Sequence, residues 1–457
     1  MKLIKNAVIS NDKELVDILY EDKIIQIGKN ISQFEFEEII DLEGKILIPG
    51  CIDAHVHFND PGYNEHEDFI TGTTAAAFGG ITTIIDMPCT SIPPVTNTEN
   101  LESKLSVIRN KAVIDFALWG GIRRNDFPIE IEKIHQLWKA GIVGFKIYTI
   151  SGMDTFAALS YEDIKQIFER FPEMLFAFHA EDAEIIKKAA DKLSELEKMK
   201  PENYLKSRPA EAEVKAVGNI LELAEKNHLH FVHISTKKAA ESILKAKSKL
   251  DVSWETCPHY LQFTAADFPQ LKGRLKTAPP VKCEDDKKFL RAALKTGKVD
   301  FITTDHAGCD WKTEKDLEDF SKVYNGIPGT QLMIPYLLSE FYVKEKVPLS
   351  TLIKLTSENA ARRYGLFPQK GSLQIGSDAD FTVIDQNRSF LVNETKLKSK
   401  GKYSPFHGQT FSCSIAKTIV RGETVFDREK GLMVDPGFGN WVKKKVNYLI
   451  AKSAKLV

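Results

Sequence analysis

Cysteine is scarce in this chain and is not arranged in pairs. The 457 residues include six cysteines with no CxxC spacing among them: Cys51, Cys89, Cys257, Cys283, Cys309 and Cys413. Scaffolds stapled by disulfides are small secreted domains, and this chain is far longer than they are. We therefore expect reduced thiols and no disulfide framework.

Long apolar runs and an excess of charge are also missing. No uninterrupted apolar stretch approaches the roughly 18 residues that span a bilayer, and residues 1–10 lack the apolar core of a signal peptide. Lys and Arg total 62 against 63 Asp and Glu, which leaves a formal net charge of −1 and no broad field for nucleic acid or an anionic membrane. We therefore expect a cytoplasmic protein whose partners are small molecules or copies of itself, with no nucleic acid and no membrane.

The most informative feature that is present is His55-Val56-His57. Side chains at i and i+2 of a strand point to the same face, so the two imidazoles can converge on one cation. The apolar residues 46–52 supply a buried strand, and the polar Asn59-Asp60-Pro61-Gly62 ends it. The pair thus lies at the carboxyl end of a strand, which is the catalytic face in a (β/α)8 barrel.

Four further side chains of ligand type follow, each at the end of an apolar, β-branched run. They are Lys146, His179, His233 and Asp305. Imidazole suits zinc and similar divalent metals, and a carboxylate adds a hard ligand and a candidate base. Each residue alone is also explained as a polar cap on a buried strand. Six such residues at the same end of successive strands instead predict a shared metal site.

Periodicity predicts an α/β fold, a (β/α)8 barrel of the TIM type with a small β-sandwich domain. Apolar strands alternate with helical stretches eight times, near residues 46–58, 80–88, 113–119, 142–149, 174–180, 228–234, 250–257 and 299–305. Ser160 is a predicted N-cap for a helix from Tyr161, and apolar spacing predicts another helix over 210–225. Short strands at both ends of the chain lie outside the barrel and are expected to pair.

The predicted domain boundaries follow from this pattern. Residues 1–49 and 365–430 form the two parts of the sandwich, residues 50–364 form the barrel, and residues 431–457 form a C-terminal tail.

Several ordered motifs resemble those of the amidohydrolase superfamily and, within it, the cyclic amidohydrolases: allantoinases, dihydroorotases and dihydropyrimidinases. The order HxH, Lys, His, His, Asp is similar to theirs, and the resemblance covers nearly the whole chain. The other matching segments are Gly72–Thr83, Asp86–Pro88, Glu255–Tyr260, Ala278–Pro280, Asn359–Arg362 and Gly371–Asp380.

The resemblance implies an enzyme that hydrolyses the C–N bond of a cyclic amide. It implies two divalent metal ions, zinc in the first place with cobalt or manganese as alternatives, held by His55, His57, Lys146, His179, His233 and Asp305. Lys146 fits such a site as a carbamate that bridges the metals, since an ammonium group repels cations. The metals share a bridging hydroxide as nucleophile, and Asp305 accepts its proton and passes it to the leaving ring nitrogen. We also expect a homo-oligomer, a dimer or a tetramer.

Three residues beside these motifs, Glu181, His259 and His306, are interpreted as packing groups or as partners that orient the metal-bound imidazoles. An alternative of a different class is a scaffold relative that keeps the fold and loses the metal. Such a protein is expected to lack several of the six ligands, and all six are present here.

Three positions bear on the substrate. Dihydroorotases hold a substrate carboxylate with an arginine, an asparagine and a histidine, at positions where this chain has Asn59, Cys89 and Cys309. These candidate substrate-binding residues cannot replace a bidentate, charge-assisted contact. Arg208 is a candidate compensating cation, and its alternative role is a salt bridge in an exposed loop.

Other segments look more like those of allantoinases: Met87–Pro94, Leu118–Gly121, Ser207–Glu213, Asp305–Cys309, Gly326–Gln331 and Ser404–Gly408. We therefore expect a neutral cyclic ureide as the substrate. Dihydroorotate and hydantoin or dihydropyrimidine rings are the alternatives.

Overall fold

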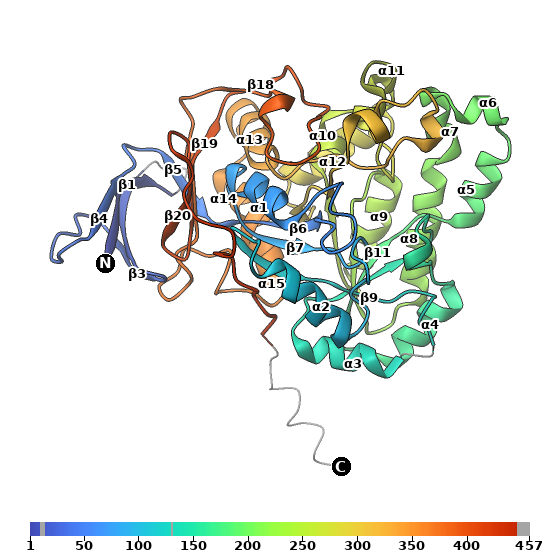
Figure 1. Cartoon of the computed structure of the whole chain (residues 1–457), viewed down its shortest axis with the longest axis horizontal. Coiled ribbons are helices and arrows are strands. Elements are labelled where there is room, and N and C mark those ends of the chain that lie inside the picture. Colours follow the sequence, from blue (N-terminus) through green and yellow to red (C-terminus); the bar gives the residue numbers. More distant parts are fainter. Residues whose placement is uncertain (10–13, 129–130, 446–457) are drawn as a thin grey trace, which may run out of the picture.

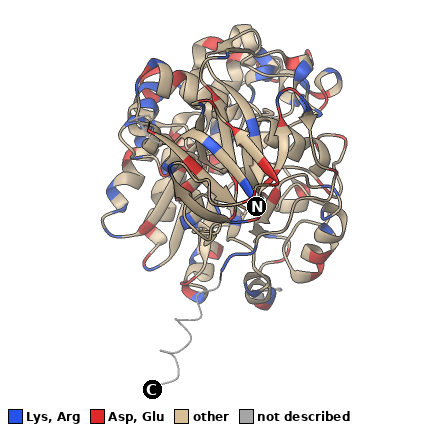
Figure 2. Cartoon of the chain, turned by 90° about the vertical axis from the view of Figure 1, so that its left-hand side faces the viewer, with Lys and Arg blue, Asp and Glu red and all other residues tan. Residues whose placement is uncertain are grey.

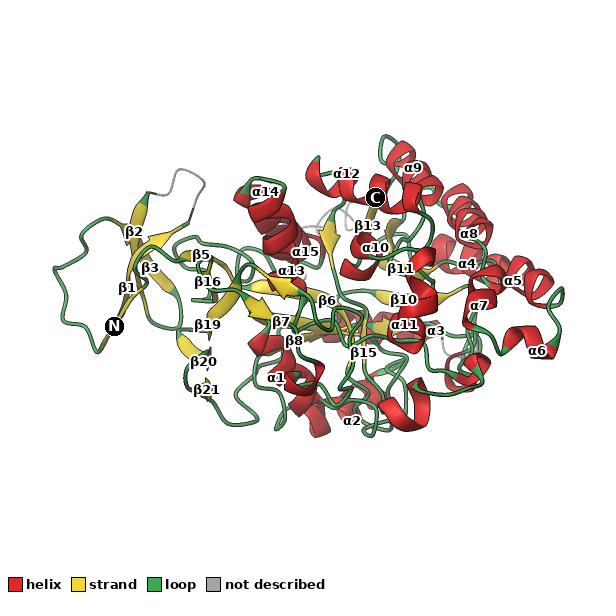
Figure 3. Cartoon of the chain, turned by 90° about the horizontal axis from the view of Figure 1, so that it is seen from above, coloured by secondary structure: helices red, strands yellow, loops and turns green. Residues whose placement is uncertain are grey.

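Parallel strands close into a barrel at the centre of the molecule, and helices surround it (Figures 1 and 3). The computed structural model describes residues 1–9, 14–128 and 131–445. The barrel strands are β6 Cys51–His57, β7 Ile81–Asp86, β8 Asp115–Leu118 with β9 Gly120–Gly121, β10 Phe145–Tyr148, β11 Leu175–His179, β12 His228–Phe231, β13 Asp251–Thr256, and β14 Phe301–Ile302 with β15 His306–Ala307. Strands β6 to β8 pair in one sheet and β9 to β14 in another, and β15 pairs with β6 to close the ring. Each of the eight predicted places holds a barrel strand, with β9 and β15 just beyond the predicted ranges 113–119 and 299–305, and the predicted fold class is confirmed.

Helices follow the strands and cover the outside of the barrel (Figure 3). The longer ones are α1 Phe69–Phe78, α2 Thr98–Ile108, α3 Ile131–Ala140, α4 Tyr161–Arg170, α5 Ala183–Ala190, α8 Ala210–Leu223, α9 Lys237–Ala246 and α12 Glu284–Lys295. The shorter ones are α6 Glu195–Lys198, α7 Pro201–Ser207, α10 Pro258–Gln262, α11 Phe268–Leu271, α13 Met333–Leu337, α14 Leu349–Ile353 and α15 Asn359–Arg363. Ser160 caps α4 as predicted, within a capping box completed by Asp163. Helix α8 ends two residues before the predicted boundary, because Ala224 is extended.

A second sheet, built from both ends of the chain, lies at one end of the barrel (Figure 1). Its strands are β1 Lys2–Val8, β2 Leu15–Tyr20, β3 Ile24–Gly28, β4 Glu38–Asp41, β5 Ile46–Pro49, β16 Phe381–Asp385, β19 Ser414–Val420, β20 Glu423–Asp427 and β21 Gly431–Leu432. They form one continuous sheet that branches at β1, which pairs with β2, β4 and β5. The two halves share an apolar core, in which the rings of Tyr20 and Phe381 meet edge to face at 5.4 Å. A small two-stranded pair, β17 Phe390–Leu391 and β18 Thr410–Phe411, lies outside this sheet.

The chain passes from this sheet into the barrel at Gly50, between β5 and β6. A Cβ atom at Gly50 would lie 2.2 Å from Thr82 Oγ1 and 2.7 Å from Asp380 Cβ, so no larger residue fits without movement. This close approach holds the start of the barrel against the sheet domain.

The predicted tail, residues 431–457, begins inside the sheet domain, since Gly431–Leu432 form β21 and pair with β20, and later described residues pack on the barrel. Trp441 forms a bridge with Phe116, and the backbone N–H of Val442 donates to the carbonyl of Phe116 at 2.7 Å. Residues 446–457 of that predicted segment lie outside the described residues. No helix in the described part of the chain is both long and apolar enough to cross a membrane. Figure 2 shows acidic and basic residues interspersed on the side of the second sheet, in keeping with the balanced charge.

Candidate metal centre

His55 and His57 end β6 and face the interior of the barrel. Ile52 and Ala54 belong to the apolar cluster inside the barrel, so strict alternation would turn Val56 inward and both histidines outward. The pairing of β6 with β7 shifts register just before Val56, which packs instead between strands and helices. Bulges re-aim side chains next to active sites. This irregularity directs both imidazoles inward.

Asp305 brings a carboxylate to the same point. Its Oδ1 lies 3.1 Å from Nε2 of His55 and 3.2 Å from Nε2 of His57, and the three ligand atoms all lie within 4.8 Å of one another. The residue lies between β14 and β15 with a φ of 51°, a strained conformation of the kind that clusters at functional sites. Burial raises the pKa of Asp305, but His55 and the neighbouring imidazoles hold it well below its usual range. The carboxyl group of Asp305 is therefore anionic at neutral pH.

A second group of ligand-type side chains lies beside the first. His179 ends β11, and its Nδ1 lies 3.0 Å from Nε2 of His233, which follows β12 with a φ of 40°. The ring of His233 lies 5.5 Å from that of His55, so the two groups adjoin. Lys146 is fully buried in β10, with Nζ 5.2 Å from the ring centre of Tyr148.

Two of the polar atoms that meet here lack hydrogen-bond partners within the described residues. Lys146 Nζ and His233 Nδ1 are buried without a hydrogen bond, although burying an unpaired polar group costs free energy. Burial lowers the pKa of Lys146 to about 8, against the opposing charges of Cys89 and Asp305. A neutral, nucleophilic amine is therefore accessible near neutral pH. The imidazoles, the carboxylate and this amine fit divalent metal ions.

Buried carboxylates orient the imidazoles from behind. Nδ1 of His55 donates to Glu255 at 2.5 Å, and Glu255 also contacts Nε2 of His230 at 3.1 Å. Glu181 lies 3.0 Å from Nε2 of His179. Metal-bound imidazoles use such partners to fix their ring orientation. The sequence suggested Glu181 for this role but Glu255 was missed, although it too lies near the end of a barrel strand.

The other two histidines beside the motifs make packing contacts. His306 lies 3.0 Å from Glu67 and accepts from the backbone N–H of Thr330. His259 is buried against Tyr260, and burial lowers its pKa to about 4. Their contacts agree with the interpretation from the sequence.

Five of the six predicted ligands, all but Lys146, line a cavity of about 530 Å³ at the carboxyl ends of the barrel strands. Its wall also includes Cys89, Thr90, Tyr148, residues 150–153, Arg208, Ala278 and residues 321–325. Cys89 Sγ lies 3.1 Å from the hydroxyl of Tyr148 and 3.7 Å from Nδ1 of His57. The ring of Tyr148 stacks on that of His179 at 5.1 Å. Tyr148 was not singled out from the sequence, yet it joins the wall to the metal site.

Of the three predicted substrate-binding residues, Cys89 lines the cavity, whereas Asn59 and Cys309 do not. Asn59 is buried with a φ of 21°, and its side-chain atoms have no hydrogen-bond partner among the described residues. Cys309 is buried with Sγ 3.4 Å from the hydroxyl of Tyr403. Any effect of these two residues on a substrate must therefore pass through neighbouring groups.

Arg208 does not lie in an exposed loop as one alternative expected. Its side chain is 17% exposed, lines the cavity, and pairs through Nε and Nη2 with both oxygens of Glu181. Burial raises the pKa of Glu181, but Arg208 and His179 hold it well below its usual range. The ion pair thus ties the cavity wall to His179.

Comparison with known proteins decides the family. A family model described as "Amidohydrolase family" matches residues 46–425. The chain belongs to the amidohydrolase family. The resemblance to cyclic amidohydrolases inferred from the motifs is thereby confirmed.

Members of this amidohydrolase family match nearly the whole chain. An allantoinase from Rubrobacter xylanophilus is 35% identical over 446 residues, and one from Bacillus velezensis is 35% identical over 447 residues; each match covers 96% of both chains. The solved L-hydantoinase (dihydropyrimidinase) from Arthrobacter aurescens superposes with a TM-score of 0.91 at 30% identity, over 97% of this chain and 99% of that chain. The barrel and the sheet domain are thus both shared with these amidohydrolases.

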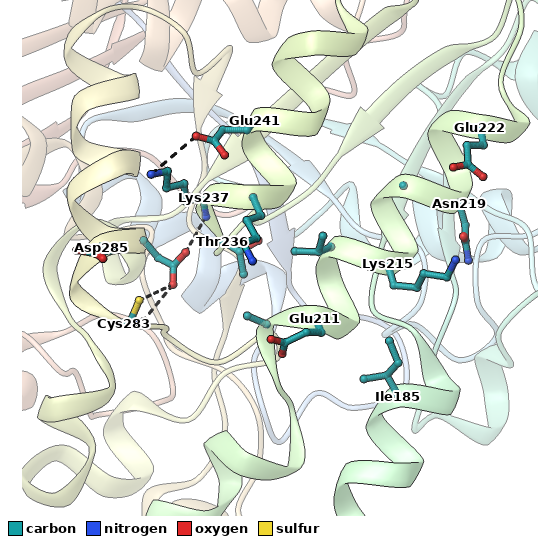
Figure 4. A pocket seen from close by; sticks show the side chains of 15 residues that line it. Ile185, Glu211, Lys215, Asn219, Glu222, Thr236, Lys237, Glu241, Cys283 and Asp285 are labelled. Carbon is teal, nitrogen blue, oxygen red and sulfur yellow. Dashed lines mark hydrogen bonds and ion pairs between the residues drawn. The ribbon is translucent and has the colours of Figure 1, made fainter.

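Another groove, of about 730 Å³, lies in the outer helical layer between α8, α9 and α12 (Figure 4). Polar side chains pair with each other on its walls: Lys237 Nζ lies 3.9 Å from Glu241, and the thiol of Cys283 donates to Asp286 at 3.0 Å. None of the six predicted ligands lines this groove. The barrel cavity, and not this groove, is therefore the candidate functional site.

Proposed function

We propose that this protein hydrolyses the ring C–N bond of a neutral cyclic ureide, as an allantoinase does. Two divalent metal ions, zinc in the first place, are held in this proposal by His55, His57, Lys146, His179, His233 and Asp305. Relatives named allantoinase, matched over nearly the full chain, support the reaction class. The cluster of His55, His57 and Asp305 supports metal dependence.

The charge of the cavity wall carries the choice of a neutral substrate. Arg208 is occupied by both oxygens of Glu181, and Lys322, 76% exposed, lies 3.2 Å from Asp319. No other Arg or Lys is among the described residues that line the cavity. A carboxylate on the substrate would therefore lack the free cation that a charge-assisted contact needs. A neutral ring has no carboxylate and does not need such a cation for binding.

Lys146 is the proposed link between the two metals. Its neutral amine can add carbon dioxide with loss of a proton, which converts a repelling ammonium into an anionic carbamate. The full burial of Lys146 and the absence of a hydrogen bond from its Nζ to any described residue support this modification. When bound, divalent cations supply Lewis acidity, which polarises a carbonyl and lowers the pKa of water.

Asp305 is the proposed base and then acid. Its carboxylate is anionic at neutral pH, because the surrounding imidazoles hold its pKa well below the usual range. It can accept the proton of the attacking water and return it to the leaving ring nitrogen, so no proton needs to enter from solvent. Tyr148 lines the cavity, and its hydroxyl is a proposed contact for a substrate oxygen.

A second candidate substrate is a hydantoin or dihydropyrimidine ring. The superposition on the Arthrobacter aurescens L-hydantoinase (dihydropyrimidinase) favours it, since the match extends over nearly the whole of both chains. These rings are also neutral, and the cavity charge does not separate them from allantoin. We further propose a homo-oligomer, a dimer or a tetramer, which sedimentation velocity measures.

A hydrolysis panel tests the proposal. Metal-replete protein is assayed with allantoin, hydantoin, dihydrouracil and dihydroorotate, with Asp305→Asn as the variant that lacks the base. We expect kcat/KM for allantoin to exceed that for dihydroorotate by roughly 10²- to 10⁴-fold, because two charge-assisted contacts are missing. We expect Asp305→Asn to lower kcat by roughly 10²- to 10⁴-fold. Efficient turnover of dihydroorotate with none of allantoin would refute the substrate assignment, and hydantoin as the best substrate would establish the second candidate.

A further inference from the structure

Two buried lysines outside the metal site bind one wall of the cavity. Lys276 and Lys315 are each 2% exposed. Nζ of Lys276 donates to the carbonyl oxygens of Phe320 at 2.7 Å and Val323 at 2.6 Å. Nζ of Lys315 donates to the carbonyl oxygens of Lys276 at 3.1 Å and Tyr324 at 2.8 Å. Two amines thus bind four main-chain carbonyls, and we call this pair of residues the lysine clamp.

The lysine clamp joins two chain segments that line the cavity. Residues 321–325 form part of its wall, and Ala278, two residues after Lys276, lines it from the neighbouring segment. The backbone N–H of Gly326 also donates to the carbonyl of Lys276 at 3.0 Å. The carbonyl of Lys276 therefore accepts hydrogen bonds from both Gly326 and Lys315. The position of residues 320–326 relative to Ala278 therefore depends on these bonds.

Neither lysine forms an ion pair with any residue that the structure describes. The acidic side chains whose fields reach them are Asp319 for Lys276 and Glu314 for Lys315, and neither forms a salt bridge with them. Burial lowers the pKa of Lys276 to about 8 and that of Lys315 to about 7. Both the ammonium and the neutral amine carry the two N–H donors that each lysine uses. The clamp therefore acts through hydrogen bonds in either protonation state.

Burying two amines without a counter-charge costs free energy. Neither solubility nor apolar packing requires a lysine at these buried positions. Aromatic rings complete the surroundings: Lys276 Nζ lies 4.8 Å from the ring centre of Tyr204, and Lys315 Nζ lies 5.2 Å from that of Tyr403. The hydroxyl of Tyr204 donates to the carbonyl of Thr277 at 2.7 Å, and its oxygen also lies 2.8 Å from Asn325 Oδ1. Every contact at this point fixes the same wall.

We propose that Lys276 and Lys315 are positioning residues that fix the 320–325 wall and thereby set the affinity for the ring substrate, an inference that rests on the proposed function. A flat ring presents its N–H and C=O groups in one plane. A wall can match them at low entropic cost only if its main chain is already fixed. The metal ligands lie on other segments, so the clamp acts on binding and not on metal content.

Lys276→Met and Lys315→Met test this, because methionine has a similar length and no donor. The amides of Tyr324 and Gly326, bonded to the carbonyls of Glu314 and Lys276, are followed by hydrogen–deuterium exchange. We expect them to exchange roughly 10- to 30-fold faster when two buried hydrogen bonds are lost. We expect KM to rise about tenfold with kcat within about twofold and metal content unchanged. Lys312→Met, at an exposed lysine of the same segment, is the matched control and should leave all readouts unchanged.

The readouts separate the possible failures. Unchanged exchange in both variants would overturn the clamp whatever the substrate is, because exchange needs no turnover. Faster exchange with unchanged KM would overturn the assignment as positioning residues. An inactive wild-type protein would count against the proposed function alone. Should a methionine variant fail to fold, Lys315→Gln, which retains an amide donor on a shorter side chain, is expected to show intermediate exchange, and wild-type exchange in it would also contradict the clamp.

Discussion

Lys146 is the residue on which the proposed two-metal centre depends most directly. It lies on β10, after His55 and His57 and before His179 in the chain, and its amine is buried without a hydrogen bond to any described residue. The nearest charged groups that raise its pKa, Cys89 and Asp305, only partly offset the effect of burial. An amine in this position has no structural purpose in the bare protein, whereas a carbamate would complete both ligand groups.

Lys146→Ala is expected to abolish turnover by removing this link. Metal analysis should show fewer than two ions per chain, while circular dichroism stays unchanged because the side chain makes no hydrogen bond to a described residue. A short carboxylic acid such as propionate, added at high concentration, should partly restore activity by filling the vacated space. A variant that keeps two metals and normal turnover without added acid would contradict the proposed centre.

The sequence predicts those site residues that are marked by the spacing of residues close to them in the chain. His55 and His57 stand out because a strand places i and i+2 on one face, and the structure brings their rings to 5.2 Å. Glu255, Tyr148 and the lysine clamp have no comparable signal. Each acts through a partner distant in sequence, and only the closed barrel brings those partners together.

Among the elements, α8 fixes the loop that follows β12. Glu213 of α8 is 1% exposed and accepts from the backbone N–H of Thr236 at 2.9 Å and of Ser235 at 3.1 Å, and from both hydroxyls at 2.6 and 2.7 Å. These residues lie two and three positions after His233, whose positive φ requires support from its surroundings. The helix therefore holds a predicted ligand in place from outside the barrel.

Glu213→Ala is expected to lower the free energy of unfolding by roughly 3 kcal/mol, because buried donors lose their acceptor. Metal affinity should fall about 10- to 100-fold, as for other groups that orient ligands. Urea unfolding and titration of the metal-free protein measure the two effects. Glu211→Ala, at an exposed position of the same helix, is the control. Loss of stability with wild-type metal affinity would show that α8 supports the fold but not the ligand.

The existence and order of the elements were predictable from the sequence, but their irregularities were not. Buried parallel strands read as continuous apolar runs, which located all eight barrel positions. The register shift in β6 leaves no trace in such a run, because every residue of the strand is buried. The breaks between β8 and β9 and between β14 and β15 are hidden for the same reason.

At the scale of the whole molecule, the sheet domain and the barrel meet at a buried cluster of charges. Lys370, 1% exposed, lies 2.8 Å from Asp380 and 3.0 Å from Asp378, which precede β16 of the sheet domain. It also pairs with Asp115 of β8, in the barrel, and Arg421 binds Asp115 from the sheet domain. The sequence predicts that both chain ends form one domain, but not the contact that ties it to the barrel, since these partners are distant in sequence.

Lys370→Met is expected to destabilise the protein by about 3–5 kcal/mol, because removing one partner leaves buried carboxylates without their counter-charge. The uncompensated carboxylates lie at the junction of the two domains. The midpoint of urea unfolding, followed by tryptophan fluorescence, should therefore shift to a lower urea concentration. Lys23→Met is the matched control: Lys23 lies 2.6 Å from the same Asp378 but is 48% exposed, and such pairs contribute at most about 1 kcal/mol. If the two variants lost equal stability, burial would not be what makes Lys370 important, and the junction would have to be held by the close approach at Gly50 and by apolar packing.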